Sequence, residues 1–326
     1  TSFLGKYGYD DRDRFLNSIS FEKFSNRSSL QASTLYHTSL RDSNTVEPLV
    51  LPDLRYRKYK KFKKSGLLLS EKYSLVGISR REGTGYSRLS ADIELSKSWQ
   101  TENGLIVRGT GNVLTAAYRE NIINTETYLL KVYPLGALEF KYPFFKGSNN
   151  KSEVLIPVAQ VVYSTDTSSS KRSIDEDSST TEFDSTTLFK LRKIPGIDRQ
   201  ENGLRLNAGL QYFYEYKDNY KYNVNLGQVY RNKNSEDFLP SSGLNGFESD
   251  ILLSGNLSFG NDLELSSKHV YSKNFNLKRS NTSLKLAKPR YQIKTSLTNL
   301  VSDASEGTST DLKELTLNLN SSFSKN

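Results

Sequence analysis

The chain has 326 residues, of which 35% are hydrophobic and 25% are charged, and its mean hydropathy is −0.60. Aromatic residues make up 11%, which argues against wholesale disorder, while the aliphatic runs fall far short of the ~20 residues of a membrane-spanning helix. The absence of cysteine excludes disulfides, zinc–thiolate sites and a thiol nucleophile in this stretch. The net charge of +9 suits an anionic partner such as nucleic acid, phospholipid or a phosphorylated glycolipid.

Strict alternation of apolar and polar residues, the period of a strand with two unlike faces, recurs along the chain. In the window 204–214, Leu204 and Leu206 face one way while Arg205 and Asn207 face the other. We predict about fifteen or sixteen strands of about 8–14 residues, with no helix between them. In chain order, the clearest windows are 89–95, 204–214, 220–226, 251–259 and 315–323.

The expected connections alternate between short and long. An antiparallel up-and-down sheet places alternate connections at opposite ends, as outer-membrane barrels do. A strand of ~11 residues tilted by ~40° spans roughly 28 Å, which fits the apolar band of a bilayer. The pattern predicts an all-β fold, a large antiparallel up-and-down transmembrane β-barrel, with a soluble β-sandwich or solenoid as the alternative. Short links are expected near 25–28, 60–65, 100–104, 217–219, 260–262 and 288–289, and longer ones near 80–86, 119–127, 165–203, 232–248 and 301–311.

Aromatic and basic residues gather at the expected strand ends. Tyrosines at 212–222 flank one tight turn and aromatic residues at 142–145 lie near another, as in the interfacial girdles of membrane proteins. The basic run 55–64 interleaves cations with aromatic rings. We interpret this run as a headgroup contact, with nucleic-acid binding as the alternative.

The sequence offers little for catalysis or metal binding. The two histidines, His37 and His269, both lie in strand patterns, where we expect them at the lumen or the membrane interface. The acidic run 175–177 lacks the ligand spacing of a calcium loop, and we interpret it as a polar surface loop. We expect no catalytic residue, no cofactor, no metal and no enzyme activity.

An ordered series of motifs runs from 153 to 230: a strand, a long acidic loop that ends in Ile194-Pro195-Gly196-Ile197-Asp198-Arg199, and a strand pair that closes on Leu226-Gly227-Gln228-Val229-Tyr230. This order resembles the LPS-assembly outer-membrane protein family, LptD, also called organic solvent tolerance protein. Similar motifs at 49–52, 82–84 and 288–290 extend the resemblance over nearly the whole chain. The loop candidates for contact with a partner are Asp175, Glu176, Asp177, Phe183, Asp184, Phe189, Pro195, Gly196, Asp198 and Arg199, and the flanking strand motif is Pro157, Gln160, Tyr163, Gly227, Gln228 and Tyr230.

The resemblance implies a translocon barrel in the cell outer membrane that inserts lipopolysaccharide into the outer leaflet without covalent chemistry. The implied partners are lipopolysaccharide, a plug lipoprotein in the lumen, periplasmic LPS bridge proteins and outer-membrane lipid, but no nucleic acid. We expect the loop 165–203 to fold over or into the lumen and to meet the plug. The rival hypotheses are a passive diffusion porin and a soluble, basic, nucleic-acid-binding β-protein.

The resemblance also bears on how much of a barrel this sequence contains. We expect residues 1–326 to be part of one barrel domain, an internal or C-terminal fragment that is incomplete at both ends. We expect the N-terminal periplasmic domain and the last strands of the family to be absent from this sequence. We therefore expect the residues of the family's lateral gate, between its first and last strands, to be missing as well.

Overall fold

The computed structural model describes residues 14–39, 46–122, 125–165, 175–178, 181–217, 219–235, 237–302 and 310–321. These residues form sixteen β-strands and one short 3-10 helix, η1 (Pro240–Ser242), and none of their helical segments has the length or apolarity to cross a bilayer. The strands are β1 (Arg14–Ser25), β2 (Ser28–Ser39), β3 (Leu49–Lys61), β4 (Leu68–Ser79), β5 (Gly85–Gln100), β6 (Ile106–Ile122), β7 (Thr125–Lys141), β8 (Phe144–Ser148), β9 (Lys151–Ser164), β10 (Gly203–Tyr216), β11 (Tyr220–Arg231), β12 (Ile251–Phe259), β13 (Leu263–Tyr271), β14 (Leu277–Lys288), β15 (Tyr291–Leu300) and β16 (Leu312–Ser321).

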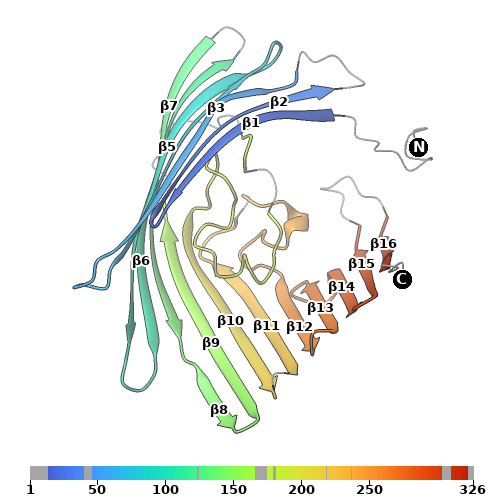
Figure 1. Ribbon diagram of the computed structural model, residues 1–326. Helices are drawn as coiled ribbons and strands as arrows, with labels where there is room; N and C mark the ends of the chain where they lie inside the picture. Colours follow the sequence, from blue (N-terminus) through green and yellow to red (C-terminus); the bar gives the residue numbers. More distant parts are fainter. Residues whose placement is uncertain are drawn as a thin grey trace. The chain divides into compact units, whose positions relative to one another are not determined.

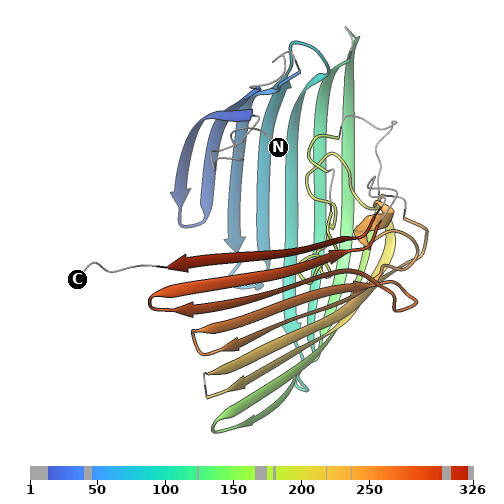
Figure 2. The same cartoon turned by 90° about the vertical axis from the view of Figure 1, so that its right-hand side faces the viewer.

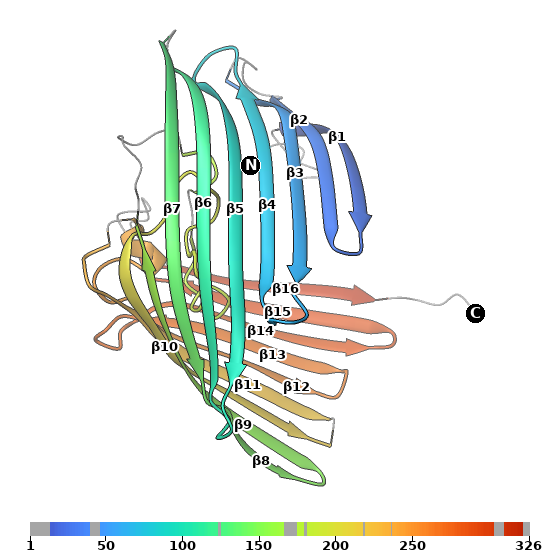
Figure 3. The ribbon, with the colours of Figure 1, turned by 90° about the vertical axis from the view of Figure 1, so that its left-hand side faces the viewer.

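The strands form one antiparallel sheet in sequence order, except that β8 pairs only with β9. Among the described residues β1 and β16 each have a single neighbour, so the sheet is not closed. This topology confirms the predicted up-and-down fold of the outer-membrane barrel class and contradicts the sandwich and solenoid alternatives. Figure 3 shows β1 to β4 side by side, and Figure 2 shows tight turns at one end of β10 to β15 and longer connections at the other.

The chain divides into two compact units. The first contains residues 1–97, 110–134 and 166–173, and the second contains 98–109, 135–165 and 174–326. Within the first unit, the basic run lies at the end of β3 and in the following turn, as predicted, and the Lys60 ammonium lies 4.7 Å from the ring centre of Phe62. The polar side of its sheet carries ion pairs such as Lys72 Nζ to Asp92 Oδ2 at 3.0 Å.

The strands of the second unit have one apolar and one polar face. In β16, Leu315, Leu317 and Leu319 are 64–70% exposed, although burial of such side chains stabilises a protein by roughly 25 cal/mol per Å². Their spacing of two residues places them all on one face. A continuous exposed face of this kind requires an apolar surrounding, which is the lipid of a bilayer. The face that alternates with it is the polar face.

Aromatic residues form a cluster on the apolar face near the turn at 217–219. The ring centroids of Tyr214 and Tyr222 lie 4.7 Å apart, and those of Tyr220 and Phe259 lie 4.4 Å apart. This arrangement fits the predicted interfacial girdle. His269 lies on the apolar face of β13, because it follows the polar-face residue Lys268. Its Nε2 lies 2.7 Å from Ser267 Oγ.

Two predictions about strand limits were wrong. β5, β6 and β7 have 16 or 17 residues and β8 has five, outside the predicted range. The predicted longer link at 119–127 belongs mostly to β6 and β7, which leaves only 123–124, outside the described residues. An ion pair of 2.6 Å joins Arg119 to Glu126 across the two strands. The predicted strand position Phe323 also lies outside the described residues.

Candidate functional site

The connection between β9 and β10 packs against the polar face of the second unit. Residues 175–178 and 181–202 of this connection are called the docked loop here, and Figure 1 shows them beside β9, β10 and β11. Apolar side chains of the loop share one buried cluster with strand residues and with the connection 232–250. The cluster contains Phe183, Leu188 and Ile194 of the loop, Val229, Leu252 and Val270 of the strands, and Phe238 and Leu244 of that connection.

A pair of glycines provides the space that the loop fills. Gly209 and Gly227 lie opposite each other on β10 and β11. A Cβ atom added at Gly227 would collide with Leu188 Cδ2 and would lie 2.8 Å from the Ala208 carbonyl oxygen. A Cβ atom added at Gly209 would lie 3.3 Å from Leu188 Cδ2. The missing side chains therefore let Leu188 approach the backbone of the sheet, as close packing requires.

Buried amides connect the loop to three strands. Asn207 Nδ2 donates to Gln160 Oε1 at 2.6 Å. Gln160 Nε2 donates to Glu139 Oε2 and to the carbonyl oxygen of Phe189, both at 3.0 Å. Since unpaired buried polar groups are costly, each partner in this network fixes the orientation of the next.

A buried carboxylate between two arginines fastens the end of the loop. Glu201 Oε1 accepts from Arg231 Nε at 2.6 Å, and Glu201 Oε2 lies 3.4 Å from Arg205 Nε. All three side chains are 2% exposed. Arg205 also donates to the Leu191 carbonyl oxygen and, at 3.2 Å, to Ser164 Oγ. Burial opposes ionisation of Glu201, but the nearby cationic charges outweigh burial, so the pKa of this carboxyl is lowered.

The turn that carries Leu188 is held from both sides. The Asp184 carboxylate accepts from the N–H groups of Thr186 and Thr187, both at 2.8 Å. The Lys193 ammonium donates to the carbonyl oxygens of Thr187, at 3.1 Å, and Leu188. Burial lowers the pKa of the Lys193 amine well below its usual value. Together these bonds fix the position from which Leu188 enters the space above the glycines.

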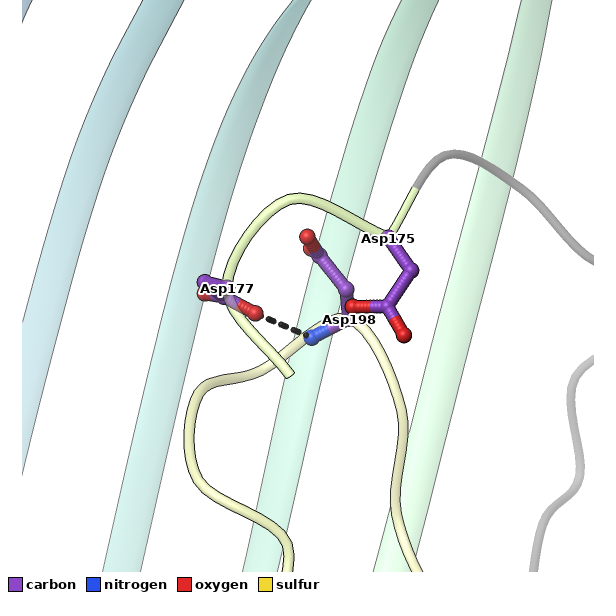
Figure 4. Close-up of side chains that lie close together, drawn as sticks. All are labelled: Asp175, Asp177 and Asp198. Carbon is purple, nitrogen blue, oxygen red and sulfur yellow. Dashed lines mark hydrogen bonds between the residues drawn. The ribbon is translucent and has the colours of Figure 1, made fainter. Parts of the chain in front are cut away.

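Two aspartates join the beginning of the docked loop to its later part. Asp177 Oδ1 accepts from the N–H groups of Ile197 and Asp198, and Asp198 Oδ2 accepts from the N–H of Glu176, all at 3.0 Å. Figure 4 shows the bond from Asp198 to Asp177, with Asp175 beside them. The three carboxylates lie within 4.8 Å of one another, and each accepts backbone hydrogen bonds of the loop, Asp175 from the N–H of Ser178. Their role in this structure is to hold the loop together.

Substitution of Gly196 by alanine is expected to open this aspartate junction. Gly196 has a φ of +77°, and an added Cβ would lie 2.5 Å from Asp177 Cγ. The matched control is Gly104→Ala. Gly104 has a φ of +90°, but no atom lies within 4 Å of an added Cβ, so this substitution introduces backbone strain without a collision. Limited proteolysis of the folded protein should cleave the loop at least about tenfold faster in Gly196→Ala than in the control. Equal cleavage rates would contradict the importance of the Asp177 contact.

The flanking motif residues divide between the two faces of the sheet. Gln160 and Gly227 lie beneath the docked loop. The other four alternate with these positions and point to the apolar face, although Gln228 Nε2 also donates to the carbonyl oxygen of Ser249 at 2.8 Å. These four are Pro157, Tyr163, Gln228 and Tyr230.

The candidate residues of the loop also differ in exposure. Those on its outer surface are exposed, whereas the buried ones act inside the loop or against the sheet. Phe183 and Asp198 are buried, Asp177, Asp184, Phe189 and Arg199 are half-buried, and Asp175, Glu176, Pro195 and Gly196 are exposed.

The candidate set omitted several residues that fasten the loop. Leu188 and Lys193 form its turn, Glu201 and Arg231 form its buried ion pair, and Gly209 lies beneath it. The alternation of β10 and β11 holds part of the missing signal, because it places Gly209 and Arg231 on the same face as Gly227. Nothing in the local pattern shows that Leu188 meets these positions.

A single antiparallel sheet with a lipid-compatible face, a polar face and a loop packed on the polar face defines an outer-membrane β-barrel protein. The family whose model matches residues 6–326 is LptD, LPS transport system D, and the chain belongs to this family. The family is one of transport proteins, and the location of the chain is the outer membrane.

Solved structures of other outer-membrane proteins were also compared with the chain. The alcaligin outer-membrane receptor FauA from Bordetella pertussis has 9% sequence identity and a TM-score of 0.41, with 96% of this chain and 64% of that chain covered. The RagAB peptide transporter has 8% identity and a TM-score of 0.38, with 93% and 51% covered. The chain thus spans less than two thirds of either protein. A search of curated proteins gave no match.

Proposed function

We propose that this chain forms part of the barrel wall of an outer-membrane translocon that inserts lipopolysaccharide into the outer leaflet without covalent chemistry. The match to the LptD family over residues 6–326 is the observation that carries the proposal. The polar face supplies hydroxyl, amide and cationic groups suited to a phosphorylated saccharide, while the apolar face contacts lipid. Polar-face residues of β11 to β15 include Asn223, Asn225, Ser254, Asn256, Lys268, Asn281, Ser283, Lys285 and Lys294.

The docked loop is the proposed contact surface for the plug lipoprotein. Its inner side contacts the sheet through Leu188 and Glu201, whereas Glu176 and Pro195 lie on its exposed side. A loop fixed in this way presents a preformed surface, which reduces the entropy lost on binding. We also propose that residues 1–326 belong to one barrel domain, and that the periplasmic LPS bridge proteins deliver lipopolysaccharide to it.

The docked loop also bears on the porin alternative. The loop and the connection 232–250 cover polar-face residues such as Asn207, Val229 and Leu252, all at most 1% exposed. A diffusion porin uses its polar face to line a water-filled channel. Steady conductance of the purified full-length protein without its plug would support the porin instead.

The test uses neighbouring residues on opposite faces. Photoreactive side chains are placed at Asn225, on the polar face, and at Leu226, on the apolar face, of the full-length protein. With lipopolysaccharide supplied from the periplasmic bridge, we expect supply-dependent adducts at position 225 and none that depend on supply at position 226. A third probe at Pro195 should capture the plug lipoprotein. Absence of lipopolysaccharide adducts at position 225 during active supply would refute the conduit.

A further inference from the structure

A cavity of about 500 Å³ lies at the end of the second unit that carries the long connections. One wall comes from the connection 232–250, with Asn234 and Phe247, and the other comes from the turn after β13, with Lys273 and Asn274. Its volume falls in the range of ~300–1,000 Å³ that is usual for small-molecule sites. None of the residues that fasten the docked loop lines this cavity.

The backbone of both walls is held by hydrogen bonds. In the first wall, the N–H of Gly246 donates to the Ser235 carbonyl at 3.1 Å, and the N–H of Arg231 donates to the Phe247 carbonyl at 2.7 Å. In the second wall, the N–H of Ser272 donates to the Asn276 carbonyl at 2.8 Å. The cavity is therefore lined by ordered backbone, and its side chains start from fixed positions.

Four of the polar side chains that line the cavity are available to a ligand. Among the described residues, the side chains of Asn234, Glu248, Lys273 and Asn274 make no hydrogen bond or ion pair with the protein. An amide side chain offers both donors and an acceptor, and a carboxylate offers acceptors only. This set of groups matches a ligand that both donates and accepts, as hydroxyl groups do.

The charge of the lining distinguishes between classes of ligand. Two carboxylates, Glu248 and Asp250, face two ammonium groups, Lys273 and Lys278, so the formal charges cancel. Asp250 Oδ2 also lies 3.0 Å from Lys278 Nζ, which neutralises half of the cationic charge directly. A site for a free phosphate group needs a cationic excess, which this lining does not have. A neutral polyhydroxyl ligand requires no such excess.

An exposed aromatic ring completes the set. Phe247 lines the cavity and is 57% exposed, although an exposed phenylalanine ring is unfavourable in water. The face of such a ring stacks on the C–H face of a pyranose, while the hydroxyl groups at the edge of the sugar reach amides and carboxylates. Groups suited to both kinds of contact line this single cavity.

We infer that this cavity binds a neutral saccharide portion of the transported glycolipid at the end of the barrel that carries the long connections. The inference rests on the proposed function for the identity of the glycolipid, but the recognition itself depends only on sugar hydroxyl and C–H groups. The site retains the saccharide as the molecule leaves the polar face, separately from the contact between the docked loop and the plug.

The experiment measures binding of lipid-free oligosaccharide, released from lipopolysaccharide by mild acid, to the full-length protein by titration calorimetry. Phe247→Ala and Asn274→Ala are each expected to weaken binding by about fivefold or more, the usual effect of one lost contact. The control is Phe275→Ala, which removes a ring that is 76% exposed and adjacent in sequence but does not line the cavity. This control should bind as the wild type does. Inorganic phosphate is titrated as a second probe and should not compete.

Two results would overturn the inference. One is oligosaccharide binding that is unchanged in both Phe247→Ala and Asn274→Ala. The fold of each variant is verified by its heat-dependent mobility in gel electrophoresis. The other is competition by phosphate, which would identify an anion site. If wild-type protein binds no oligosaccharide while the adducts at position 225 still form, the saccharide site is wrong and the proposed conduit stands. If those adducts fail as well, the proposed function is wrong.

Discussion

Substitution of Gly227 by alanine is expected to release the docked loop while the strands remain paired. The new Cβ would collide with Leu188 Cδ2 and would lie 2.8 Å from the Ala208 carbonyl oxygen, so β10 must shift locally, while alanine suits the extended backbone of β11. Overpacking of this kind costs about 1–3 kcal/mol, which raises the open population of the loop by a factor of about 5–150. Hydrogen exchange of peptides from 181–202 measures this opening, and exchange of β9 should change little.

The control and the rescue variant make the Gly227 result specific. Gly136→Ala places a methyl group on a strand with no atom within 4 Å, so exchange of the loop should not change. Leu188→Ala alone leaves a cavity and costs about 2–5 kcal/mol. In the double variant the collision with Leu188 is absent and only the close approach to the Ala208 carbonyl oxygen remains, so the double variant should be destabilised by less than the sum of the two single variants. Strict additivity would show that Leu188 does not carry the effect of Gly227.

Substitution of Glu201 by glutamine is expected to destabilise the attachment of the loop still more. The change leaves Arg205 and Arg231 buried, 2% exposed, without their carboxylate. Breaking a buried ion pair from one side costs about 3–5 kcal/mol because an uncompensated charge remains. In gel electrophoresis, the temperature at which the band of the folded protein is replaced by that of the unfolded protein should fall. The loop should also become accessible to protease.

The surface pair of Glu215 and Lys221 provides the matched control for Glu201. Its N···O distance is 2.6 Å, but the two side chains are 40% and 55% exposed. Exposed pairs contribute about 0–1 kcal/mol, so Glu215→Gln should behave nearly as the wild type does. An effect of Glu201→Gln no larger than that of Glu215→Gln would contradict the importance of the buried pair.

The pH dependence of stability gives an independent check on Glu201. Its pKa in the folded protein is lowered, so the folded state binds its proton less readily than the unfolded state. The stabilisation is complete above the unfolded-state pKa and is lost as pH falls through the lowered folded-state pKa. Wild-type protein should therefore lose more stability on acidification than Glu201→Gln. Parallel pH profiles of the two proteins would contradict the lowered pKa.

Much of the fold follows from local sequence. The period of two residues places Leu204 and Arg205 on opposite faces wherever the strand lies, so the strands and their two faces are predictable without the structure. The limits of β6 and β7 were not predictable in this way, because pairing between the two strands, and not the local pattern, sets how far each strand extends past the expected turn. The family motifs pointed to the docked loop but did not indicate its attachment to the sheet.

Sequence alone determined the alternating strands, the lengths of most connections and the resemblance to the family, because these depend on near neighbours in the chain or on ordered motifs. Only the tertiary structure decided where the loop docks. Leu188 meets Gly209 and Gly227, and Glu201 meets Arg231, across 21 to 39 residues of chain. Contacts of this kind form only after the sheet has brought distant strands together, since packing and buried charge pairing depend on three-dimensional proximity and leave no period in the sequence.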